Sequence, residues 1–121
     1  MTVGGTSSRD KGKRWEREVA RLFRDAMPGE TVKRGFQSRF GGSEEADVEC
    51  PIYHIEAKHQ QSVNIWASMR QARDDASARG LGKVPVVVAK RDARKDEPIA
   101  VLRLVDFLDL VEERHYLDNK S

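Results

Sequence analysis

The residues that decide the fold are 46–58, which read ADVECPIYHIEAK. This stretch predicts two short strands joined at Pro51. Side chains of a strand alternate between its faces, so Glu56 and Lys58 share one face of the second strand. Asp47 arrives on the preceding strand and adds a second carboxylate. Two hard oxygen ligands suit Mg²⁺, and the ammonium suits a phosphate or a metal-bound water, so the set predicts the chemistry of phosphodiester hydrolysis.

The segment from Asp10 to Met27 is predicted to be a helix that ends at Pro28-Gly29, because its apolar residues recur at helical spacing. Glu16 and Glu18 flank this apolar stripe on opposite edges. Either can lean over a neighbouring sheet, and helical geometry alone does not choose between them. The other faces are basic and can meet a phosphate backbone, although a solvated side chain is the commoner reading of any single one: Lys11, Lys13, Arg14, Arg17, Arg21 and Arg24.

A strand is predicted from Thr31 to Phe36, followed by a Gly-, Ser- and Arg-bearing loop from Gln37 to Glu45. Glycines in such a loop can let the backbone approach a ligand closely. Arg34 and Arg39 would lie near the acidic cluster if the next strand pairs back onto this one. An ordinary surface arginine is the alternative for both residues, and more strongly for Arg39.

The rest of the chain predicts a helix, two strands and a last helix. The first of these helices runs from about Val63 to Arg79, with Trp66 and Met69 expected in the core rather than as a base-stacking platform. The two strands are expected to form an antiparallel hairpin, and Asp106 is expected to cap the last helix, which should end near His115. Their predicted ranges are Val84 to Ala89 and Ile99 to Leu104.

This order, α-β-β-β-α-β-β-α, predicts an α/β domain with a mixed sheet covered by helices. A length of 121 residues, 38% of them hydrophobic, suits one core. We therefore expect a flexible N-terminal tail over residues 1–9, a single domain over 10–116 and a C-terminal tail over 117–121.

Charge is unevenly distributed along the chain. Residues 1–95 hold 19 basic and 13 acidic side chains, whereas residues 96–121 hold 3 basic and 7 acidic ones. A basic face of this kind suits a polyanion, although a solvated mixed-charge surface is commoner. Cys50 is the single cysteine, and no apolar run approaches the roughly 18 residues of a membrane span. We expect a cytoplasmic protein of a prokaryotic cell or a phage-infected host, with no membrane partner.

These residues carry a resemblance. Asp47 followed by Glu56-Ala57-Lys58, in this order of elements, resembles the restriction-endonuclease-like fold of the PD-(D/E)xK nuclease superfamily. Ala46 stands where the name-giving proline would be, and the loop before it looks enlarged. Residues 11–22, KGKRWEREVARL, resemble the opening helix of archaeal-type Holliday junction resolvases. The similarity spans about Arg9 to Leu110, and phage nucleases share the same core.

The resemblance implies a site. Asp47, Glu56, the backbone carbonyl of Ala57 and Glu16 would hold Mg²⁺ or Mn²⁺. Lys58 would orient the nucleophile or stabilise the transition state, and Arg34 would hold a phosphate. Catalytic roles are thus expected for Glu16, Arg34, Asp47, Glu56 and Lys58, and DNA contacts for Lys11, Lys13, Arg14, Arg34, Arg39 and Gln71.

Two classes of function remain open. The first is a metal-dependent endonuclease, most concretely a homodimer that nicks symmetric strands of a four-way DNA junction in recombination or repair, or a nuclease of other branched or linear DNA. The second is a non-catalytic binding module on the same fold. Trp66, Phe107 and Leu110 are candidates for the dimer interface. The three histidines lack zinc spacing, and Gly41-Gly42-Ser43 lacks the lysine of a nucleotide-binding loop, so no nucleotide cofactor is expected.

Overall fold

The computed structural model describes residues 4–35, 46–92 and 96–120, with side chains from Arg9 onward. Three helices and five strands lie in these ranges, in the predicted order. The bounds are α1 Gly4–Ala26, β1 Lys33–Arg34, β2 Val48–Glu49, β3 Tyr53–Gln60, α2 Ile65–Arg79, β4 Val84–Arg91, β5 Ile99–Val101 and α3 Leu104–Asn119.

The five strands form one mixed sheet in the order β1-β2-β3-β4-β5. The β3–β4 pair is parallel, with Glu56 opposite Val87, and the other three pairs are antiparallel. Helix α2 makes the crossover between the two parallel strands, as such a connection requires. The fold is therefore α/β, consistent with the PD-(D/E)xK restriction-endonuclease-like fold, and the predicted β4–β5 hairpin is confirmed.

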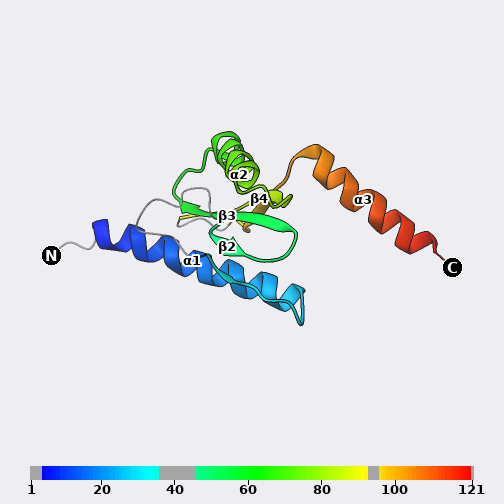
Figure 1. Cartoon of the computed structure of the whole chain (residues 1–121). Coiled ribbons are helices and arrows are strands. Elements are labelled where there is room, and N and C mark those ends of the chain that lie inside the picture. Colours follow the sequence, from blue (N-terminus) through cyan, green and yellow to red (C-terminus); the bar gives the residue numbers. More distant parts are fainter. Residues whose placement is uncertain (1–3, 36–45, 93–95, 121) are drawn as a thin grey trace.

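Helix α1 covers one face of the sheet (Figure 1). Trp15 and Val19 are buried against residues of β2, β3 and β4, and the indole Nε1 of Trp15 donates a 3.2 Å hydrogen bond to the carbonyl of Val88. Arg24 donates to the carbonyl of Val32. These bonds fix α1 along the sheet, because they tie two separate turns of the helix to the chain beneath it.

Helix α2 covers the opposite face, where Ala72 packs on Val87 and Ala89 (Figure 1). The helix begins after Asn64, whose side chain accepts a 3.0 Å hydrogen bond from the Ala67 N–H. It ends at Gly80, which has a φ of 64°. Glycine adopts this left-handed conformation without the steric cost that other residues meet.

Helix α3 packs on neither face of the sheet and projects from the body of the molecule (Figure 1). Its predicted cap is wrong: Arg103 occupies the N-cap position, and Asp106 lies inside the first turn. There the Asp106 carboxylate accepts a 2.8 Å hydrogen bond from Nε of Arg103. A negative side chain in the first turn is stabilised by the helix dipole, which explains an acidic residue there without a cap.

Several boundaries and one core assignment differ from the predictions. Helix α1 begins at Gly4, inside the expected tail, because no proline separates that segment from the periodic one. Helix α3 runs to Asn119, into the expected C-terminal tail, and β1 and β5 are shorter than predicted. Trp66 is 75% exposed rather than in the core, because Ser68, Ala72 and Ala76 are the residues that α2 buries. None of the helices in the described ranges is long and apolar enough to cross a membrane.

Candidate active site

The backbone around Asp47 is held by close contact with the end of β1. A Cβ at Gly35 would lie 1.9 Å from the carbonyl oxygen of Ala46, so only glycine fits there. The Gly35 N–H donates to the carbonyl of Asp47 (2.8 Å), and the Asp47 N–H donates to the carbonyl of Ile55 (2.9 Å). Asp47 is thus fixed between β1 and β3 at the place where β2 begins.

The Asp47 side chain reaches β3. Its Oδ2 accepts a 2.9 Å hydrogen bond from the Ala57 N–H. The pKa of Asp47 is raised from 3.8 to about 7, first because burial disfavours the charged form and next because the Glu56 carboxylate lies close to it. Lys58 acts in the opposite direction and favours the charged form. Asp47, Glu56 and Lys58 therefore form one electrostatic cluster.

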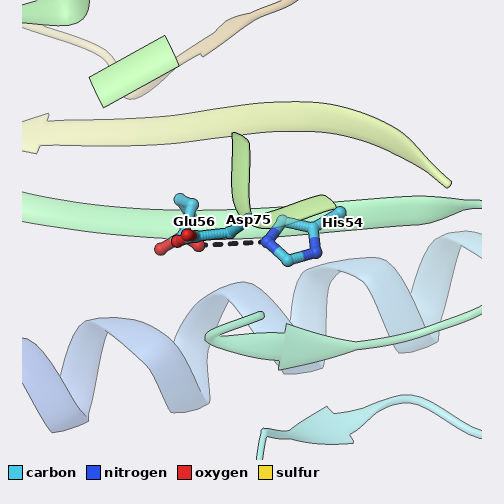
Figure 2. A group of neighbouring side chains, drawn as sticks. All are labelled: His54, Glu56 and Asp75. Atoms are coloured by element: carbon cyan, nitrogen blue, oxygen red, sulfur yellow. Dashed lines mark hydrogen bonds and ion pairs between the residues drawn. The ribbon is translucent and has the colours of Figure 1, made fainter. Parts of the chain in front are cut away.

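Glu56 faces α2 and is almost completely buried, with 3% of its surface exposed. His54, two residues earlier on the same face of β3, is equally buried, and its Nε2 lies 3.1 Å from Oε1 of Glu56. Asp75 of α2 completes the group, as Figure 2 shows. One ligand atom of each side chain lies within 4.8 Å of the others, which makes the three a second candidate cation site that shares Glu56.

Of the two glutamates on α1, Glu16 is the one beside Asp47. Its pKa is raised by burial and by the charge of Asp47, while Arg34 opposes the shift. Nε of Arg34 donates a 3.1 Å hydrogen bond to Oε1 of Glu16. Glu18 instead pairs on the surface with Arg21 (2.8 Å). The structure thus brings Glu16, Arg34 and Asp47 together across α1, β1 and the start of β2.

Lys58 lies at the outer end of the cluster. Its Nζ is 3.5 Å from Oε1 of Gln71, which is exposed on α2. This contact places Gln71 next to Lys58.

The basic residues predicted to contact DNA differ in their surroundings. Lys11 forms an ion pair with Asp92, which also lies 3.0 Å from Nε2 of His59. Lys13 and Arg14 on the same helix are exposed. Arg39 and the rest of the predicted loop from Gln37 to Glu45 lie outside the described residues.

Sequence reasoning missed two side chains in this region and one backbone requirement. The strand period puts His54 on the face of Glu56, but it does not show that the two side chains are buried against each other. Asp75 was overlooked, although it comes four residues after Gln71 and therefore lies one turn along the same side of α2. Gly35 gave no signal beyond being a glycine after a basic residue.

A carboxylate just before β2, a second on β3 with a lysine two residues after it, and a glutamate from the covering helix offer oxygen ligands for a divalent metal and a cation for a phosphate, which is the chemistry of a metal-dependent nuclease. The comparison with protein families agrees. A family described as "Phage putative PDDEXK endonuclease" matches residues 7–116, and the chain belongs to that family. No curated protein matches the chain. Endonucleases of the PD-(D/E)xK type act on DNA and typically use a divalent metal ion.

Proposed function

We propose that this protein is a metal-dependent endonuclease of branched DNA, and specifically a resolvase that nicks symmetric strands of a four-way junction as a homodimer. The observation that carries the proposal is the proximity of the Asp47 and Glu56 carboxylates beside Lys58. Family membership supports the endonuclease activity. The likeness of residues 11–22 to the opening helix of junction resolvases supports the finer substrate assignment.

The donor set fits a hard divalent cation. Asp47 and Glu56 repel each other in a poorly hydrated place, which is one reason why the pKa of Asp47 is high, and a cation between them would remove that repulsion. The N–H and C=O of one strand residue point to the same side, so the Ala57 carbonyl is directed toward Asp47 as its N–H is. Mg²⁺ or Mn²⁺ held by Asp47, Glu56 and the Ala57 carbonyl, with Glu16 nearby, would supply an acidified water and neutralise phosphate charge.

Lys58 and Arg34, which lie around this set, would bind the phosphate and stabilise its charge. In hydrolysis, a water oxygen bonds to phosphorus, one P–O ester bond breaks and the leaving oxygen takes up a proton. Negative charge grows on the phosphate oxygens, and the Lys58 ammonium stabilises it most in a water-poor site. Arg34 holds Glu16 through Nε and has further N–H groups for a phosphate.

DNA binding would use the exposed basic side of α1. Lys13 and Arg14 are exposed and can neutralise backbone phosphates. Lys11 already pairs with Asp92, so its contribution to DNA binding is smaller. Gln71, which lies next to Lys58, would donate a hydrogen bond to the strand being cut. Arg39 is retained as a DNA contact on the sequence prediction alone.

A second candidate function comes from the buried group formed by His54, Glu56 and Asp75. If a cation bound there served only to stabilise the fold, the protein would be a nucleic-acid-binding module that keeps the family fold. Asp47 separates the two functions, because it belongs to the proposed catalytic set and lies outside the His54 group. Divalent-metal binding that is unchanged in Asp47→Ala would favour the binding module.

The direct test is cleavage of a labelled four-way junction and of a linear duplex of matched sequence, with Mg²⁺ or with a chelator. Wild type should place paired symmetric nicks in the junction alone, and Lys58→Ala should lower the rate by about 10²–10³-fold. Lys83→Ala is a matched control, because Lys83 immediately precedes β4 and does not lie beside Lys58. Metal-dependent cutting of both substrates would reduce the proposal to a general nuclease. Binding of the junction without cutting would overturn the catalytic assignment.

A further inference from the structure

Helix α3 exposes an unusual amount of apolar surface. Its large hydrophobic side chains are each between 38% and 70% exposed: Leu104, Val105, Phe107, Leu108, Leu110, Val111, Tyr116 and Leu117. Scattered exposed hydrophobic residues are ordinary on a protein surface, but a contiguous patch marks an interaction site. A helix with this composition that projects from the body needs a partner to cover it (Figure 1).

The two sides of α3 differ in charge. Residues of an α-helix are about 100° apart around its axis. One half of α3 therefore carries six of the apolar residues, namely Leu104, Phe107, Leu108, Leu110, Val111 and Leu117. Asp109, Glu112 and Glu113 lie together on the other half. Over its whole length the helix holds five acidic residues and one basic residue.

An apolar groove of about 740 Å³ lies at the base of α3, between α2 and β5. Its apolar lining includes Trp66 and Met69 of α2, Val101 of β5, and Leu104 and Phe107 of α3. The charged residues that line it are all arginines, Arg70, Arg73 and Arg103. The groove is thus apolar inside and basic at its edge. Helix α3 carries most of its large apolar residues on one half, together with the Arg114–Asp118 ion pair near its C-terminal end, and acidic residues on the other half.

We infer that the apolar side of α3 docks into this groove on a second copy of the chain, and that the second copy's α3 docks into the first in return. The charge pattern selects this occupant, because Glu112 and Glu113 lie next to the two margins of the apolar half, where docking of that half would bring them to the arginine edge of the groove. Since Leu104 and Phe107 already form one wall of the groove, α3 leaves its own groove and runs outward (Figure 1). Reciprocal docking is the self-complementary contact of a two-fold dimer.

The proposed resolvase acts as a homodimer, and this interface would provide that dimer. The inference rests on the proposed function to that extent. The observations behind it are separate, because none of the α3 or groove residues belongs to the acidic cluster. Oligomeric state can be measured without DNA or metal, so a failure of the dimer and a failure of cleavage are distinguishable. A monomer that still nicks DNA would overturn the dimer alone, whereas an inactive dimer would overturn only the nuclease proposal.

The first test is the mass of the purified full chain by light scattering over a range of concentrations. Wild type should have twice the 13.7 kDa of one chain. Leu110→Glu combined with Leu117→Glu should halve that mass, and circular dichroism should show that the fold persists, because neither side chain is buried within one chain. Leu22→Glu is the matched control on α1: it also places a charge at an exposed leucine and should leave the dimer intact. A monomeric wild type would overturn the proposal, as would a dimeric double variant.

The second test reverses the charges. Arg70→Glu with Arg73→Glu should give a monomer, as should Glu112→Lys with Glu113→Lys. A chain carrying all four substitutions should be a dimer again, because each helix then meets a groove edge of opposite charge. If the variant with all four substitutions stays monomeric, α3 does not dock in this groove.

The third test asks whether the docking is between chains. Arg70→Cys and Glu113→Cys are prepared as separate proteins, mixed and oxidised, and the native Cys50 does not interfere because it is buried. A disulfide-linked heterodimer, absent from either protein alone, is expected. Failure to cross-link the mixture, together with cross-linking inside a single chain that carries both cysteines, would show that α3 closes on its own groove instead.

Discussion

The backbone N–H of Ala57 donates a 2.9 Å hydrogen bond to Oδ2 of Asp47, so the strand that carries Glu56 and Lys58 also holds the second carboxylate. This bond favours the charged form of Asp47, but burial and the Glu56 carboxylate outweigh it and raise the pKa to about 7. Without a cation, the charged carboxylates of Asp47 and Glu56 therefore repel each other in the folded chain. This repulsion lowers the stability of the metal-free fold and favours binding of a cation.

The first prediction concerns stability against pH without metal. Because the pKa of Asp47 is about 7 when folded and 3.8 in the reference state, the folded chain keeps a proton that the unfolded chain loses as pH rises between those values. Asp47 thus lowers the free energy of unfolding progressively over that range, and the full cost remains above pH 7. Asp47→Asn should be more stable than wild type at pH 8, and the difference should disappear near pH 4. Urea unfolding at several pH values in chelator measures this.

A matched variant isolates the effect. Glu30→Gln also removes a carboxylate, but from an exposed position between α1 and β1. Its difference from wild type should be small and should not grow between pH 4 and pH 8. If Asp47→Asn shows the same flat course as this control, the two carboxylates do not repel each other as the structure indicates.

The second prediction concerns metal. Adding Mn²⁺ or Mg²⁺ at pH 7 should raise the melting temperature, because a ligand that binds only the folded chain stabilises it. At a hundred times its Kd, the ligand raises the free energy of unfolding by about 2.7 kcal/mol. Since the cation would displace the proton from Asp47, the increase should be larger at pH 8 than at pH 5. Asp47→Asn should lose most of it. An increase that is equal in wild type and Asp47→Asn would place the cation with His54, Glu56 and Asp75 instead.

The third prediction concerns two glycines. Gly35→Ala should destabilise the fold by roughly 1–3 kcal/mol, because its Cβ would lie 1.9 Å from a backbone oxygen of Ala46, which cannot move aside without shifting Asp47. Gly12→Ala is its opposite: that Cβ meets nothing within 4 Å in α1, so the variant should be more stable by roughly 0.5–1 kcal/mol. Chemical denaturation of both variants measures the two changes. If Gly35→Ala leaves the stability unchanged, the backbone at Gly35 does not lie as close to Ala46 as the structure shows.

Much of the fold could be predicted from local pattern. The period of two in β3 separates Glu56 from Ile55, and Trp15 and Val19, which belong to the helical apolar stripe of α1, are buried. What local pattern does not contain is how one element lies on another. Asp75 reaches Glu56 only because α2 crosses the sheet at one particular angle and position, and periodicity does not encode that placement. The same holds for Trp66, whose helix presents small residues to the sheet.

Helix α3 shows a second limit. Its apolar residues predict a helix that is covered, and the simplest cover is the sheet of the same chain. The structure leaves those residues exposed. The apolar pattern of a helix indicates that its surface is to be covered. It does not indicate whether the covering surface belongs to the same chain or to another. Asp106 is a related case, because an acidic residue favours the first helical turn as well as the cap.

The last prediction separates a positioning role from a structural one for His54. The side chain is 3.1 Å from Glu56 and buried with it, so His54→Ala leaves a buried carboxylate without that contact and should lower stability. Because Glu56 would then be free to turn, the metal concentration for half-maximal cleavage should rise by about 10–100-fold. His54→Gln, which retains a donor, should recover part of both losses. His59→Ala is the matched control: it removes a contact of 3.0 Å with Asp92, away from Glu56, and should lower stability without changing the metal dependence. Equal metal dependence in the His54 and His59 variants would show that His54 only supports the fold.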